Sequence, residues 1–85
     1  MTWDEWVEAN PLKRWMVEHG VTQTQVASHF GRSPFTVYTW LRGIRPDFHN
    51  ADWFWDGMRT LTADDDIEAK WRAWEQIKPR IGGKA

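Results

Sequence analysis

Residues 20–46 read GVTQTQVASHFGRSPFTVYTWLRGIRP, and this run predicts two short helices joined by a turn at Gly31. Thr22 can cap the first helix, because a threonine oxygen accepts a bond from a free backbone N–H group. Ser33 and Pro34 supply a cap and a first-turn proline for the second helix. Apolar residues recur at spacings of three and four in both helices, so each has one face that needs a partner. These residues are Val26, Ala27, Phe30, Val37, Trp40 and Leu41.

Residues 11–47 resemble the helix-turn-helix of the phage repressor and Cro-like family. The resemblance rests on Thr22-Gln23 at the start of the scanning helix, the aliphatic-alanine pair Val26-Ala27, the turn at Gly31 and the serine that begins the recognition helix. It implies an all-α, lambda-repressor-like bundle of about five helices with the helix-turn-helix at its centre. It also implies that the second helix lies in the major groove of double-stranded DNA.

By the family pattern, the DNA-contacting residues lie on and beside this second helix. Pro34 and Phe35 occupy its first exposed positions, where family members commonly place amides. Phe35 can instead contact a thymine methyl group, or it can turn inward as part of the core. The full set of expected DNA-binding residues is Gln23, Arg32, Ser33, Pro34, Phe35, Thr36, Tyr38, Thr39, Arg42 and Arg45.

Polar side chains in this set have different expected roles. The resemblance implies a phosphate contact for Gln23. Arg32 and Arg45 are candidate phosphate partners, whereas Arg42 can reach a phosphate or a guanine; plain solvation is the alternative for each arginine. The hydroxyl groups that can reach a base or the DNA backbone belong to Thr36, Tyr38 and Thr39.

Charge is distributed unevenly along the chain, whose formal net charge is −1. Residues 1–10 carry −3, residues 11–47 carry +3 and residues 48–85 carry −1. The positive charge therefore lies on the segment expected to bind DNA. Because it is small, we expect few phosphate contacts and a shallow salt dependence of binding.

The other helices are predicted from their caps. Thr2 and Glu5 have the spacing of a capping box, and Asn10-Pro11 begins a second helix. Asp47 or Asn50 can cap a further helix, whose helical propensity is lowered at Gly57.

A last helix is expected over residues 62–78, capped at Thr62 and followed by acidic residues in its first turns. Its apolar stripe has two interpretations: it covers the core of the helix-turn-helix, or it forms a homodimer contact. The candidate dimer residues are Trp71, Trp74 and Ile77. We expect residues 1–79 to form a single domain and residues 80–85 a frayed tail.

Composition argues against several classes of protein. With no cysteine and with histidines scattered at positions 19, 29 and 49, we expect no disulfide, metal or cofactor. We expect no enzyme, since a Gly-rich phosphate loop and a nucleophile with a nearby base are both lacking. The amino terminus has no apolar run typical of a signal peptide, and no segment reaches the length of a membrane span. We therefore expect no membrane partner and a cytoplasmic location, in a prokaryotic nucleoid or a phage-infected host.

These expectations combine into a hypothesis for function. The chain is expected to be a sequence-specific transcriptional regulator, a homodimeric repressor that reads the major groove with residues 33–42. The alternative is a protein-interaction module on the same fold, such as an antitoxin or a phage protein that docks on a protein partner. Eight tryptophans and a near-neutral charge would suit this alternative.

Overall fold

The computed structural model describes residues 1–46 and 51–79, and these residues form six helices and no strand. The expected all-α fold is confirmed, with six helices where about five were expected. The helices are α1 (Trp3–Glu8), α2 (Pro11–His19), α3 (Gln23–Phe30), α4 (Pro34–Leu41), α5 (Asp52–Thr62) and α6 (Ile67–Gln76).

The first four helices begin at the caps that the sequence predicts. Thr2 and Thr22 each close a capping box, with Glu5 and Gln25 respectively at the third helical position. The caps of α2 and α4 are Asn10 and Ser33, and each is followed by a first-turn proline.

Glycines with positive φ lie at the end of α3 and just after the end of α4. Gly31 has φ 65° and allows the short turn from α3 into α4. Gly43 has φ 98°, and a Cβ atom on it would lie 2.7 Å from the ring of Trp6. Glycine at position 43 therefore permits the turn after α4 and also the close approach of α1.

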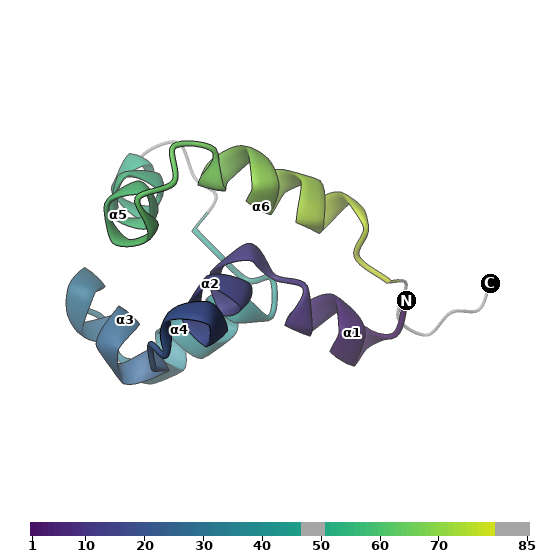
Figure 1. Cartoon of the computed structure of the whole chain (residues 1–85), viewed down its shortest axis with the longest axis horizontal. Helices are drawn as coiled ribbons and strands as arrows, with labels where there is room; N and C mark the ends of the chain where they lie inside the picture. The colour runs from purple at the N-terminus through teal and green to yellow at the C-terminus, as the bar shows by residue number, and fades with distance from the viewer. Residues whose placement is uncertain (47–50, 80–85) are drawn as a thin grey trace.

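Figure 1 shows α6 running from α5 towards α1, with α2, α3 and α4 on the other side of the molecule. Contacts join α3 to α4, α3 to α5, α5 to α6, α2 to α6 and α1 to α2. A single core results, to which every helix contributes. Its largest fully buried side chains are Trp6, Leu12, Val26, Val37, Phe54, Met58 and Trp71.

Trp6 of α1 and Trp74 of α6 hold the two ends of the described chain together. Each indole N–H donates to the backbone carbonyl of the other residue, at 2.8 Å and 2.6 Å. The rings are stacked with centroids 3.9 Å apart. A six-residue helix is not stable alone, so this pairing explains how α1 persists.

Helix α5 continues through Gly57, where the sequence indicates only a weakened helix. A Cβ atom at this position would lie 2.3 Å from Phe30. Glycine is therefore required for α3 to pack against α5. The contact with Phe30 offsets the low helical propensity of glycine at this position.

The expected boundaries of the last helix are wrong. Thr62 ends α5, where its hydroxyl donates to the Met58 carbonyl, and α6 begins only at Ile67. Asp64 thus precedes α6 and accepts a bond from the backbone N–H of Asp66. The proposed caps Asp47 and Asn50, and the tail at residues 80–85, lie outside the described residues.

Candidate nucleic-acid interface

Two aromatic side chains stand on the outer face of α4. Phe35 is 71% exposed and Tyr38 is 43% exposed. Their rings stack with centroids 6.0 Å apart and an interplanar angle of 24°. The alternative that Phe35 turns inward as part of the core is therefore wrong.

The opposite face of α4 explains this orientation. Val37, Trp40 and Leu41 are buried against the rest of the molecule, at 0%, 2% and 4% exposure. With 3.6 residues in each turn, burying these three positions leaves Phe35 and Tyr38 on the solvent side. The sequence correctly predicts these three buried positions, and the structure decides between the two orientations that the sequence leaves open for Phe35.

Hydroxyl groups on α4 are largely occupied within the helix. Ser33 Oγ accepts a bond from the Thr36 N–H at 3.2 Å and lies 3.0 Å from Thr36 Oγ1. Thr39 Oγ1 donates to the Thr36 carbonyl at 2.6 Å. The donor proton of Thr39 is thus already used in the free protein.

Cations lie at both ends of α4, each placed over an aromatic ring. At the amino end, the Arg32 guanidinium is 4.5 Å from the ring centroid of Trp53. At the carboxyl end, Arg42 is 5.4 Å from the ring of Tyr38 and 5.9 Å from that of Trp3. Such contacts hold long, otherwise mobile side chains in place while their charge stays near the surface.

Lys78 and Trp3 extend this surface, and sequence analysis missed both. The Lys78 Nζ atom lies 5.6 Å from the same Trp3 ring that Arg42 approaches. No spacing rule links residues 3, 42 and 78, because they come from α1, the end of α4 and the segment after α6. They meet through tertiary packing, because α1 packs against α6 through Trp6 and Trp74 and approaches the end of α4 at Gly43.

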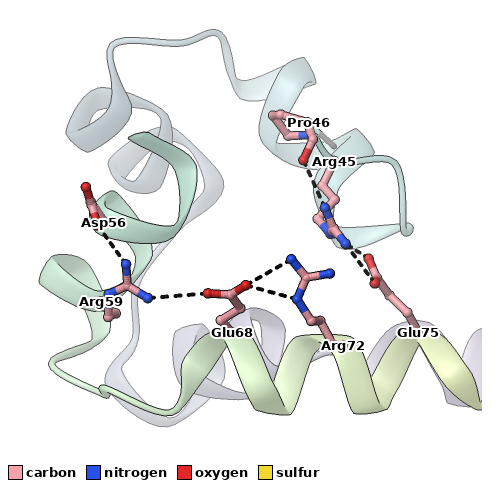
Figure 2. A network of polar contacts seen from close by, with 7 residues as sticks. All are labelled: Arg45, Pro46, Asp56, Arg59, Glu68, Arg72 and Glu75. Carbon is pink, nitrogen blue, oxygen red and sulfur yellow. Dashed lines mark hydrogen bonds and ion pairs between the residues drawn. The ribbon is translucent and has the colours of Figure 1, made fainter. Parts of the chain in front are cut away.

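Arg45 is not available for the phosphate contact expected of it. Figure 2 shows its guanidinium directed at Glu75 of α6, with Nε 2.7 Å from Oε2 and Nη2 3.0 Å from Oε1. Nη1 donates to the Pro46 carbonyl, and the guanidinium also lies over the ring of Trp55 at 5.0 Å. With only 10% of its side chain exposed, Arg45 acts as a link between the end of α4 and α6.

Gln23 lies at the first position of α3, beside the start of α4. Its side-chain amide is 3.5 Å from the Pro34 carbonyl, and the residue is partly buried. This contact brings the amino ends of α3 and α4 together. Pro34 itself is exposed.

The expected dimer contact through Trp71 and Trp74 is wrong for these two side chains. They are 0% and 3% exposed, because both are needed to fill the chain's own core. The core interpretation of the stripe is therefore confirmed for them. Ile77, at 55% exposure, is the member of the set that remains at the surface.

A groove of about 700 Å³ lies between α2 and α6. Trp15, Ile67 and Trp74 line it, and both basic and acidic side chains border it. No residue of α4 contributes to it. The candidate interface on α4 is therefore separate from this groove.

Among the described residues, no group of three or more His, Cys, Asp or Glu side chains could hold a metal ion. Within the same parts of the chain, every helix is too short or too polar to cross a membrane. Comparison of the chain with protein-family models, with curated proteins and with solved structures found no match.

Proposed function

We propose that this protein is a sequence-specific regulator of transcription that binds double-stranded DNA by placing α4 in the major groove. The observation that carries this proposal is the outer face of α4, where Phe35 and Tyr38 are exposed and cations lie at both ends. In this proposal α3 and α4 are the two members of a helix-turn-helix, and α4 is the recognition helix.

The dimensions of α4 support its placement in DNA. A helix of eight residues is about 12 Å long, which is similar to the roughly 12 Å width of the major groove. Arg32 precedes this helix and Arg42 follows it. The two guanidinium groups would therefore face the phosphates that border the groove, while Phe35 and Tyr38 face the base edges.

The amino end of α3 supports the proposal in a second way. Free backbone N–H groups and the helix dipole favour an anion at this end, and Gln23 lies beside it. Arg45, which pairs with Glu75, is no longer part of the proposed interface. Few cations thus remain to neutralise phosphates, so a shallow salt dependence is still expected.

We further propose that the protein represses transcription by covering a promoter, in the cytoplasm of a bacterium or of a phage-infected host. Two copies on an inverted repeat would place their α4 helices about 34 Å apart, one turn of DNA, or a multiple of that distance. With Trp71 and Trp74 buried, such a dimer would have to use other surface residues, of which Ile77 is one.

The test is selection of duplex DNA from a random pool by the purified protein at near-physiological salt. We expect enrichment of one sequence, and an inverted repeat within it would indicate binding of two copies. A folded sample that enriches no sequence and shows no salt-dependent affinity for duplex DNA would contradict the proposal.

The variant Arg42→Gln tests the proposed interface from the protein side. We expect it to weaken binding to the selected site and to lower the slope of log affinity against log salt concentration by about one unit. Arg14→Gln is the control, because Arg14 is an exposed arginine that lies on α2 beside the groove between α2 and α6. If the salt slope is the same for both variants and the parent, Arg42 does not contact a phosphate.

One observation favours the alternative function, docking on a protein partner. Three apolar side chains are exposed within a short segment, since Ile44 is 69% exposed in addition to Phe35 and Tyr38. Exposed aromatic and aliphatic groups of this kind often form protein interfaces. A protein-docking module would lack the salt-dependent affinity for duplex DNA, so the same measurement separates the two functions.

A further inference from the structure

The outer face of α4 has few free hydrogen-bonding groups with which to read bases. The Ser33 oxygen caps the helix and also lies against Thr36 Oγ1, and Thr39 donates its proton within the helix. An exposed face that carries neither an amide nor a carboxylate cannot form the bidentate amide pair that usually identifies adenine, nor accept the bond from the cytosine amino group. Base recognition by this face therefore depends mainly on its apolar groups.

Those groups are the stacked rings of Phe35 and Tyr38. The cation at Arg42 lies 5.4 Å from the Tyr38 ring and supports that ring on its far end. The two rings thus present a continuous and laterally supported apolar surface, rather than two independent side chains. In the major groove the apolar group of an unmodified base pair is the C5 methyl group of thymine.

We propose that α4 recognises the C5 methyl group of pyrimidines through Phe35 and Tyr38, so that the protein discriminates thymine from uracil and 5-methylcytosine from cytosine. This inference rests on the proposed function and names the chemical group that the interface reads. It makes DNA binding sensitive to methylation of cytosine at C5, because that modification places the same methyl group at the same edge of the groove.

The DNA side of the test adds or removes one methyl group at a time in the selected site. Each thymine is replaced in turn by uracil, which keeps every hydrogen-bonding group of thymine and lacks only the methyl group. We expect a loss of about fourfold in affinity for each methyl group contacted, the factor that corresponds to burying about one methylene-sized group. Cytosine at a contacted position is compared with 5-methylcytosine, and methylation is expected to raise affinity by a similar factor.

The protein side of the test uses Phe35→Ala and Tyr38→Ala. Each variant should bind the thymine and uracil forms equally at the position that its ring contacts, and Tyr38→Phe should retain the discrimination. Both residues are exposed, so the melting temperature of each variant should stay close to that of the parent. Val17→Ala is the control, since Val17 is 68% exposed but lies on α2, and it should discriminate as the parent does.

The outcomes distinguish this inference from the proposed function. Duplex binding that tolerates uracil at every position would overturn the inference and leave the proposed function standing. Discrimination that persists unchanged in both alanine variants would also overturn it, because other residues would then contact the methyl group. Absence of any duplex binding would overturn the proposed function itself, and the inference with it.

Discussion

Asp64, in the turn before α6, has a carboxylate that is fixed by two hydrogen bonds. Its carboxylate accepts a bond from Lys70 Nζ at 2.6 Å and another from the Asp66 N–H at 2.9 Å. The bond from Lys70 is the larger cause and that from Asp66 the second, and together they hold the pKa of Asp64 below its ordinary value of 3.8. The ionised Asp64 carboxylate therefore stabilises the folded protein above pH 3.8, and this contribution is lost as the pH falls through the lowered pKa.

Lys70→Met tests this pair. We expect the pKa of Asp64 to rise towards 3.8 but to remain below it, because the Asp66 N–H still donates to the carboxylate. Carbon-detected NMR titration of the Asp64 carboxyl measures the change. Lys13→Met should leave the titration unaltered, since Lys13 lies near Glu8 instead. An Asp64 pKa that is the same with and without Lys70 would show that the pair does not form in solution.

At the scale of the helices, the end of α5 contains one unfavourable residue. Ala63 has φ 55° and is the non-glycine residue with positive φ among those described. Its N–H donates to the Arg59 carbonyl and closes the helix in the left-handed conformation that glycine adopts at the ends of α2 and α3. An alanine in this region costs about 1 kcal/mol relative to glycine.

Ala63→Gly is accordingly expected to raise the free energy of unfolding by about 0.5 to 1 kcal/mol. Ala73→Gly is the matched control, because Ala73 is an exposed alanine in the interior of α6. Glycine should there lower the free energy of unfolding by about 1 kcal/mol. Urea unfolding measures the change in the free energy of unfolding for both variants. A loss of stability in Ala63→Gly would contradict the left-handed backbone conformation of residue 63.

At the scale of the whole molecule, contacts between distant segments hold α4 in position. The Trp6 and Trp74 pair joins α1 to α6, and Trp6 also packs against the backbone at Gly43. The Arg45 and Glu75 pair joins the segment after α4 to α6 at a second point. The segment that follows α4, the proposed recognition helix, is therefore held at Gly43 by Trp6 and at Arg45 by Glu75, and neither contact involves the outer face of α4.

Arg45→Met should lower the free energy of unfolding by about 1 to 3 kcal/mol, since it removes two charge-assisted bonds and leaves the Glu75 carboxylate without its partner. Arg45→Lys keeps the charge but not the two parallel bonds, so we expect it to recover only part of the loss. Urea unfolding measures both. Folded Arg45→Met protein should bind DNA with the salt slope of the parent, and a slope lower by one unit would instead place Arg45 on a phosphate.

Much of the fold could be predicted because its signals are local. The caps at Thr2, Asn10, Thr22 and Ser33 act on backbone groups two or three residues away, so the sequence alone locates the first four helices. The inward and outward faces of α4 also follow from its own spacing. Prediction failed at the start of the last helix, because Thr62 forms its hydrogen bond backwards into α5 rather than forwards.

The sequence by itself determined the all-helical fold, the turn at Gly31 and the buried face of α4, since these depend on hydrogen bonds and periodicity within one or two helical turns. Tertiary structure alone decided that Arg45 pairs with Glu75, 30 residues away, and that Trp74 is a core residue bonded to Trp6, 68 residues away. It also brought Lys78 and Arg42 to the ring of Trp3. Partners so far apart in the chain meet only through packing, and no local spacing encodes that packing.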